Sequence, residues 1–410
     1  MTVTTSGALG LLAEIAGIGR DGATGGYNRF AFTVEDAALA EWFEAQCRSR
    51  GLDVVIDRCG NQWAWCGDPD RSIREGNGPG VVTGSHLDSV PDGGALDGPL
   101  GVASALAAVD LLREGGLTSR GLARPLGIVR FVDEEGARFG LACSGSRLVT
   151  GAAAPQKVLA LKDAAGVTYA DAMRSAGVRP EAAGHDREAL ARVGAFVELH
   201  VEQGRALATP EIDAPVGVAT MIRPHGRWLV DLAGRADHAG TTLLVDRLDP
   251  MLDLARLVTT VRALAMSTGS VATVGKVDVR PNAVNAIPSH VSAWLDARAD
   301  TAEQVRDVLA GLAEAGFTCI EESWTPSTHL DADLSGRVAA SVAATLGKAP
   351  RLATGAGHDA GVLAQAGIPS AMIFVRNPTG ASHTPAERAE DDDIDTGDRA
   401  LAAVLADLVS

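Results

Sequence analysis

Four apolar stretches of this 410-residue sequence run directly into residues that bind metal ions or transfer protons. They are found in VVTGSHLDSV (with GGALDGPLG shortly after it), GIVRFVDEEGARF, AFVELHVEQG and, after IFVRN, PTGASHTPAE. In an open α/β sheet the carboxyl ends of the strands form the edge at which ligands bind. The pattern therefore predicts that six side chains converge at one edge, namely those of His86, Asp97, Glu134, Glu135, His200 and His383.

Most of these residues have an ordinary explanation when each is considered alone. A histidine after a strand is usually a loop residue, and Asp97-Gly98 is a common turn pair. His200 differs, because it interrupts the apolar stretch FVELHV, where an unpaired imidazole would be costly. Taken together, three histidines and two carboxylates supply two divalent cations if one carboxylate bridges them, which is an arrangement of two-metal hydrolases.

The adjacent pair Glu134-Glu135 allows the two carboxylates to take different roles. One binds a metal ion, and the other points at the activated water and acts as a general base. Asp88, two residues after His86, is expected to fix the orientation of that imidazole. The chemistry predicted for this edge is metal-assisted hydrolysis, for which zinc, manganese, cobalt and nickel all suit the ligands.

The elements that position these residues alternate between short strands and helices rich in alanine and leucine. Strands are predicted over residues 81–83, 126–132, 195–201 and 370–375, and helices over residues 98–113, 335–346 and 359–366. Helices that alternate with strands in this way cover both faces of a mostly parallel sheet. We therefore predict an α/β catalytic domain of this type.

Between about residues 215 and 326 the pattern changes to β-α-β-β-α-β, the order of the ferredoxin-like motif. Strands are predicted over residues 228–233, 271–277, 290–297 and 317–321, and helices over residues 250–266 and 302–314. The economical account is an α+β domain over residues 215–326, inserted into a catalytic domain formed by residues 1–214 and 327–410.

The composition limits the class of protein. The length favours two domains, and a formal charge of −16 with only four lysines argues against nucleic-acid or anionic-membrane partners. No apolar run reaches the roughly 18 residues of a membrane span, and MTVTTSGALG has no signal-peptide pattern. The five cysteines are scattered, which indicates reduced thiols; they are Cys47, Cys59, Cys66, Cys143 and Cys319. We therefore expect a soluble, cytoplasmic protein.

Nine motifs, taken in order, point to a family. GSHLDSV, GGALDGPLGV, FVDEEGARFG, ELHVEQG, DHAGTT, RPNAVNAIP, DAR, GAGHDA and SHTPAE resemble the hydantoinase/carbamoylase branch of the M20 metallopeptidase-like family. The resemblance extends from about Gly26 to the end of the chain. Members of this branch include N-carbamoyl-L-amino-acid amidohydrolases, allantoate amidohydrolases and β-ureidopropionases.

The resemblance implies a role for each matching residue. One metal ion would be held by His86 and His200 and the other by Glu135 and His383, with Asp97 between them and Glu134 as the general base. The inserted domain looks like the family's lid and dimerisation domain. In it, His238 would stabilise the developing oxyanion, often from the partner subunit, and Arg298 would hold the substrate's carboxylate with Asn285 beside it. Gln203 and His358 would complete the pocket.

The activity implied is hydrolysis of the ureido (N-carbamoyl) C–N bond of a small anionic acid by a homodimer with two divalent metal ions. Allantoate and N-carbamoyl-L-amino acids remain equally open as substrates. The motif LDSVPDGG lacks the glutamine of several β-ureidopropionase-like members, which favours these α-ureido acids over 3-ureidopropionate. Leu243-Leu244 stands where the family commonly has Pro-Met, a change that touches the pocket's shape but removes no chemical group.

Two other functions have sequence signatures of their own. An M20 exopeptidase or N-acyl-amino-acid deacylase usually has D-x-K-G after the bridging aspartate and an acidic residue in place of His200. This chain instead has Asp97 followed by Gly-Pro-Leu-Gly. A catalytically inactive binding protein of the same fold would lack a ligand or the base, and the motifs retain every one of them.

Overall fold

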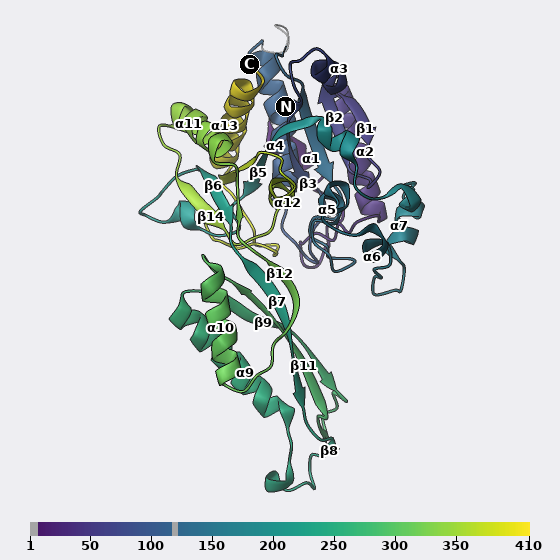
Figure 1. Ribbon diagram of the computed structural model, residues 1–410, viewed down its shortest axis with the longest axis vertical. Helices are drawn as coiled ribbons and strands as arrows, with labels where there is room; N and C mark the ends of the chain where they lie inside the picture. Colours follow the sequence, from purple (N-terminus) through teal and green to yellow (C-terminus); the bar gives the residue numbers. More distant parts are fainter. Residues whose placement is uncertain (1–6, 117–121) are drawn as a thin grey trace. The chain divides into compact units, whose positions relative to one another are not determined.

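The chain forms two compact units in a computed structural model that describes residues 7–116 and 122–410. Unit 1 consists of Met1–Thr220 and His329–Ser410, and unit 2 consists of Met221–Thr328 (Figure 1). Unit 2 is therefore inserted between two parts of unit 1. The start of the chain, on which the expectation of no signal peptide rests, lies partly outside the described residues.

Unit 1 is built on a large sheet with the strand order β1-β2-β4-β3-β5-β15-β6-β13, and β14 pairs with β6. The central strands β4, β3, β5 and β15 run parallel, whereas β1, β2 and β6 pair antiparallel at the flanks. The prediction of an α/β fold with a mostly parallel central sheet is confirmed. The strands are β1 (Asp53–Ile56), β2 (Gln62–Cys66), β3 (Gly80–His86), β4 (Leu126–Phe131), β5 (Val193–Val201), β6 (Val216–Ile222), β13 (Thr328–His329), β14 (Arg351–Thr354) and β15 (Ser370–Val375).

Helices lie on both faces of this sheet (Figure 1). On one face α1, α4 and α13 pack against one another, and α5 and α12 pack together elsewhere in the unit. The helices of unit 1 are α1 (Ala8–Glu14), α2 (Val34–Ser49), α3 (Pro69–Arg74), α4 (Pro99–Glu114), α5 (Ser144–Thr150), α6 (Pro155–Leu159), α7 (Tyr169–Ser175), α8 (Arg187–Ala191), α11 (Ala332–Leu346), α12 (Asp359–Gln365) and α13 (Asp391–Val409).

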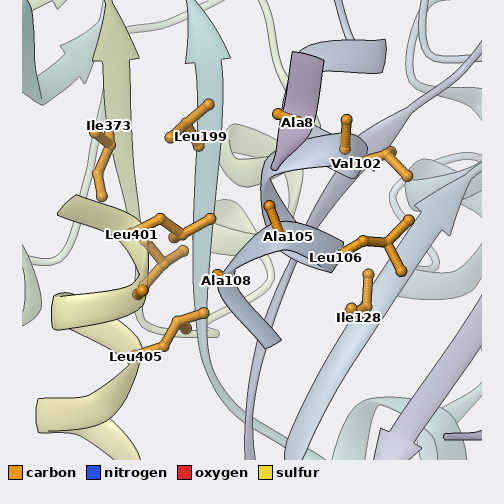
Figure 2. Packing of buried hydrophobic residues seen from close by; sticks show 14 of the residues in the cluster. Ala8, Val102, Ala105, Leu106, Ala108, Ile128, Leu199, Ile373, Leu401 and Leu405 are labelled. Atoms are coloured by element: carbon orange, nitrogen blue, oxygen red, sulfur yellow. The ribbon is translucent and has the colours of Figure 1, made fainter. Parts of the chain in front are cut away.

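Helix α4 lies in the middle of the core and is buried along most of its length. A helix that is apolar all round can only be stable when it is covered on every side. Figure 2 shows Leu106 of α4 near Ile128 of β4, while Leu401 and Leu405 of α13 point toward β5, the strand that carries Leu199. Each such side chain contributes roughly 1.5–3 kcal/mol when it is fully buried. This packing fixes the N-terminus of α4, where Asp97 lies.

Unit 2 contains an antiparallel sheet with the order β12-β7-β11-β9 and two helices, α9 and α10, that pack against each other. Side chains along β11 alternate between buried and half-buried, so one face of the sheet is covered. A small ribbon, β8 with β10, extends beyond the sheet. The elements are β7 (His225–Ala233), β8 (Asp237–His238), α9 (Pro250–Thr268), β9 (Val271–Arg280), β10 (Ala286–Ile287), β11 (His290–Arg298), α10 (Ala302–Glu314) and β12 (Ile320–Thr325).

One predicted strand of unit 2 starts too early. Residues 317–321 were expected to form it, but β12 begins at Ile320. The N–H of Phe317 donates to the carbonyl of Leu312, 2.9 Å away, and the ring is buried in the core of the unit. Phe317 therefore closes the end of α10 rather than opening the strand. The sequence pattern does not distinguish the two arrangements, because the apolar side chain is buried in either of them.

The helices and the cysteines bear on the expectations about membrane spans and reduced thiols. None of the helices in the described residues is long and apolar enough to cross a membrane. The five cysteines, all within the described residues, carry free thiols. Three of them, Cys47, Cys59 and Cys143, are buried.

Candidate functional site

The carboxyl ends of the central parallel strands bring the predicted metal ligands of unit 1 together. His86 is the last residue of β3, and His200 is the penultimate residue of β5. Their imidazole rings are both buried, with ring centroids 5.9 Å apart. Because β3 and β5 are parallel neighbours, their ends meet at the same edge of the sheet, as the sequence predicts.

The hydrogen bonds of these two histidines fix which ring nitrogen faces the site. Nδ1 of His86 lies 3.1 Å from the carbonyl oxygen of Asp88, and Nδ1 of His200 lies 2.9 Å from the carbonyl oxygen of Val201. A carbonyl only accepts, so Nδ1 carries a proton, and Nε2 is the nitrogen left to bind a metal ion. Both Nε2 atoms are buried and have no hydrogen-bond partner within the described part of the chain.

Asp97 lies between the two halves of the cluster and directs a different oxygen to each half. Its Oδ1 is 3.7 Å from Nε2 of His86 and 3.2 Å from Nε2 of His200. Its Oδ2 is 3.5 Å from Nε2 of His383 and also accepts a hydrogen bond of 2.8 Å from Gln203. This geometry is what a carboxylate needs in order to bridge two cations.

The second half of the cluster consists of Asp97, Glu135 and His383. Oε2 of Glu135 lies 3.6 Å from Nε2 of His383, whose side chain is half exposed in the loop after β15. The ligand atoms of this set lie within 4.8 Å of one another, and the same is true of His86, Asp97 and His200. The residues thus form two candidate metal sites that share Asp97.

The electrostatics of the cluster favour added positive charge. Burial raises the pKa of Glu135 to about 8 and raises the pKa of Glu134 well above its usual value. Burial alone would lower the pKa of His86, but Glu134 and Asp88 raise it well above its usual value. The same carboxylates that hold a proton on the His86 ring would stabilise a divalent cation bound in its place. Imidazole and carboxylate donors in this arrangement fit divalent metal ions.

Asp88 plays a larger part than the sequence indicated. It was expected to orient His86 through its carboxylate, but the closer contact to His86 comes from its main-chain carbonyl, and Oδ1 lies 3.4 Å away. Its carboxylate accepts the main-chain N–H groups of Glu134 at 3.1 Å and of Glu135 at 3.0 Å. Asp88 therefore fixes the loop that carries the proposed base and its neighbouring ligand.

Two further residues hold the Asp97 loop in place. Oε2 of Glu387 accepts the N–H groups of Leu96 at 2.8 Å and of Asp97 at 3.0 Å. Gly98 has φ +85°, and a Cβ at that position would lie 2.3 Å from the His86 ring. The Asp97-Gly98 pair is thus a close approach to a metal ligand and not only a turn. Glu387 lies in the SHTPAE motif, but nothing in its spacing reveals a contact some 290 residues away.

His358 lies behind His200, with ring centroids 4.6 Å apart. Burial lowers its pKa well below the usual value, so the ring is neutral, and its Nε2 has no hydrogen-bond partner in the described residues. Glu198, His200 and His358 form a third group of possible ligands. The carboxylate of Glu198 is already engaged, since it accepts from Ser85 Oγ at 2.7 Å and from the N–H of Ala360 at 3.1 Å.

The three predicted residues of unit 2 lie in two separate places. His238, in β8, is opposite Ala286 of β10, and the carbonyl of Asn285 accepts the N–H of Ala239, so His238 and Asn285 are neighbours. Arg298 is at the far end of β11, where it pairs with both carboxylate oxygens of Asp296 at 2.8 and 3.1 Å. We expected Asn285 to lie beside Arg298, but within one copy of unit 2 the two residues are apart.

The tautomer of His238 is also defined. Its Nδ1 accepts the N–H of Gly240 at 3.0 Å, so Nε2 carries the proton and is a hydrogen-bond donor. Nδ1 therefore accepts in His238, whereas it donates in His86 and His200. A donor suits an oxyanion, whereas an acceptor suits a metal ion.

Comparisons with known proteins agree with the motifs. The model of peptidase family M20/M25/M40 matches residues 82–407. An N-carbamoyl-L-amino acid amidohydrolase from Geobacillus stearothermophilus is 36% identical, over 95% of this chain and 95% of its own. An allantoate amidohydrolase from Escherichia coli (strain K12) is 31% identical, over 96% of this chain and 95% of its own.

The fold agrees as well. A crystal structure of an amidase of the hydantoinase/carbamoylase family from Burkholderia vietnamiensis is 28% identical. It superposes with a TM-score of 0.84, over 100% of this chain and 99% of its own. The chain therefore belongs to peptidase family M20/M25/M40, and its relatives there are amidohydrolases of the carbamoylase and allantoate types.

Proposed function

We propose that this chain is a two-metal amidohydrolase that cleaves the ureido C–N bond of a small linear acid and releases ammonia and carbon dioxide. Its family and relatives make it a hydrolase of C–N bonds other than peptide bonds. The two-metal proposal rests on how the carboxylate of Asp97 divides its two oxygens between the two sets of ligands. Oδ1 lies toward His86 and His200, and Oδ2 lies toward His383. The substrates proposed are N-carbamoyl-L-amino acids or allantoate.

The two metal sites follow from this division. His86 and His200 would hold one divalent cation, Glu135 and His383 would hold the other, and Asp97 would be shared. When bound, zinc, manganese, cobalt or nickel ions would polarise the ureido carbonyl and make the attacking water more acidic. The carbonyl contacts of Nδ1 in His86 and His200 support this assignment, because they leave Nε2 of each ring as the nitrogen that faces the site.

Glu134 is the proposed general base. It neighbours the ligand Glu135, and its Oε2 lies 3.8 Å from Nε2 of His86. It would accept the proton of the attacking water and later pass that proton to the leaving nitrogen. Burial favours the protonated form of Glu134, which suits its second task.

The residues of unit 2 would recognise the two ends of the substrate. The protonated Nε2 of His238 would donate to the oxygen that develops negative charge, with Asn285 as a neighbouring donor. Arg298 would hold the carboxylate, since a guanidinium matches two oxygens at once. Gln203 and His358, on either side of the metal cluster, would complete the pocket.

Unit 2 (Met221–Thr328) is also the proposed lid and dimerisation domain, which the sequence predicts over about residues 215–326. Its helix α9 exposes four large apolar side chains, namely Met251, Leu252, Val258 and Met266. Apolar side chains exposed along one helix are typical of a protein–protein contact. The proposed homodimer rests on these exposed side chains. The proposed cytoplasmic location rests on the free cysteine thiols, which are typical of a reducing compartment.

Ammonia release tests the function directly. The purified protein would be treated with a chelator and assayed with allantoate, N-carbamoyl-L-alanine and 3-ureidopropionate, without metal and after addition of zinc, manganese, cobalt or nickel. We expect activity to return with metal and to be highest on one of the first two substrates. Activity on N-acetyl-amino acids or dipeptides but on none of the ureido acids would contradict the proposal.

A further inference from the structure

The loop that carries Glu134 is paired along its length with the start of helix α5. Residues 143–145 donate their main-chain N–H groups to the carbonyl oxygens of residues 132–134, in antiparallel order. The bonds run from Cys143 to Glu134 at 2.5 Å, from Ser144 to Asp133 at 3.0 Å and from Gly145 to Val132 at 3.0 Å. Side chains repeat the pairing, because Ser144 Oγ donates to Asp133 Oδ2 at 2.7 Å.

At the first of these pairs the side-chain contact reaches the proposed base itself. Sγ of Cys143 lies 3.3 Å from Oε1 of Glu134, and the cysteine is only 3% exposed. Burial raises the pKa of the Cys143 thiol well above its usual value, so the sulfur keeps its proton and acts as the donor. Cys143 has φ 55°, a conformation that side-chain-bearing residues seldom adopt.

The two oxygens of Glu134 therefore have different surroundings. Oε1 accepts from the thiol, while Oε2 is the oxygen that lies 3.8 Å from Nε2 of His86, on the side of the metal ligands. A carboxylate free to rotate about its last bond would present either oxygen, or neither, to the water. A general base is effective only when its accepting oxygen is held within reach of the proton.

We propose that Cys143 is a positioning residue, whose thiol holds Oε1 of Glu134 and so keeps Oε2 directed at the reacting water. The proposal rests on the proposed role of Glu134 as general base. Cys143 transfers no proton and touches no substrate. It acts through Glu134 alone, so its loss affects the chemical step more than substrate binding.

Cys59 provides a matched control within the same unit. It is also a buried free cysteine, it belongs to an apolar cluster with Phe139 and Tyr169, and its thiol donates to the carbonyl of Gly184 at 3.4 Å. Removing the sulfur of Cys59 or of Cys143 deletes a buried atom of the same size. Only in Cys143 does the deletion also remove a hydrogen bond to Glu134.

The experiment compares kcat and KM for Cys143→Ala, Cys143→Ser, Cys59→Ala and Glu134→Gln in the metal-loaded enzyme. The substrate is allantoate or N-carbamoyl-L-alanine, whichever the wild type hydrolyses faster. We expect Cys143→Ala to lower kcat about tenfold with little change in KM, as for the loss of one hydrogen bond to a charged group. Cys143→Ser, which keeps a donor, should recover most of the loss, and Cys59→Ala should keep wild-type kcat.

A second measurement does not depend on turnover. The S–H stretching band of Cys143, identified as the infrared band lost in Cys143→Ser, should shift in Glu134→Gln, where a neutral amide replaces the carboxyl acceptor. This comparison can be made on the metal-free protein. An unshifted band would overturn the proposal, because the thiol would not be bonded to Glu134.

The kinetic outcomes separate this proposal from the function on which it rests. If Glu134→Gln is inactive but Cys143→Ala turns over like the wild type, the positioning role is overturned and the general base stands. The positioning role is also overturned if Cys143→Ser is as slow as Cys143→Ala, or if Cys59→Ala is equally slow. If Glu134→Gln keeps wild-type turnover, the general-base assignment fails and the positioning role falls with it.

Discussion

His238 and Arg298 lie at opposite ends of the sheet of unit 2. Arg298 ends β11 opposite His225, whereas the other end of β11, at His290, leads toward the ribbon that carries His238 (Figure 1). β11 has nine residues, and at about 3.4 Å per residue it is roughly 27 Å long. A small acid cannot reach both residues of one copy. A pocket that uses both must therefore take them from two copies of the chain.

Subunit mixing tests this consequence. In a hybrid of Glu134→Gln and His238→Ala chains, the site with an intact Glu134 receives an intact His238 from its partner. If the two variants exchange subunits freely, half of the dimers are hybrids with one working site in two, so activity should return to about a quarter of the wild-type value. Activity that stays at the level of the separate variants, with exchange verified by a mass tag, would contradict the cross-subunit role.

Replacement of the proposed base should separate metal binding from catalysis. Glu134→Gln keeps the size of the side chain and the ligands of both metal sites, so metal content should stay at the wild-type level. We expect turnover to fall at least about a hundredfold, the scale of losing a general base. Metal analysis and kcat are measured on the same sample, and Glu135→Gln serves as the contrast because it should lose metal as well.

Arg298→Lys should act mainly on substrate binding. A lysine offers one point charge where the guanidinium makes paired hydrogen bonds, so KM for the ureido acid should rise about tenfold. Arg227→Lys is the matched control, because Arg227 also pairs with Asp296, at 3.4 Å, from the neighbouring strand. It should leave KM unchanged.

The same role predicts a dependence on the substrate's charge. An analogue whose carboxylate is converted to an amide should be a poor substrate for the wild type and nearly indifferent to Arg298→Lys. If the wild type hydrolyses the amide as well as the acid, Arg298 does not bind the carboxylate.

The buried carboxyls predict how pH affects the metal-free protein. Burial raises the pKa of Glu135 and of Asp359 to about 8 in the folded state, above the value near 4 of an unfolded chain. The folded state therefore binds more protons, and stability is lost as the pH rises from about 4 through 8. We expect the chelated protein to melt at a lower temperature at pH 8.5 than at pH 6.

Added zinc or manganese should reduce this loss, because a cation stabilises the ionised carboxylates. Thermal melting at both pH values, with chelator and with metal, measures the effect. Equal decreases in melting temperature with and without metal would show that the carboxyl cluster is not a metal site.

Local patterns account for much of what the sequence predicts correctly. The helix predicted over residues 302–314 is α10, whose start is defined by Thr301 and Gln304 in a capping box. The strand predicted over residues 370–375 is β15, an apolar run of the length of a buried strand. Signals of this kind are contained within a few residues, so they can be read without the fold.

What the sequence did not reveal depends on contacts between distant residues. Nothing near Glu387 indicates that its carboxylate holds the N–H of Asp97. Likewise, the spacing of Cys143 and Glu134 does not distinguish a buried thiol in a core from one bonded to the proposed base. The separation of Asn285 from Arg298 follows from the strand register, which a motif-by-motif comparison does not contain.

The insertion of unit 2 also determines when the cluster is complete during translation. His200 and Asp97 leave the ribosome early, but His383 and Glu387 follow only after the whole of unit 2 and β15 have been synthesised. Until then Asp97 lacks the acceptor of its N–H, and the second metal set lacks its histidine. Because chains emerge from their N-terminus, the second metal site cannot be loaded before His383 has been synthesised, and a chain that stalls before His383 remains without that site.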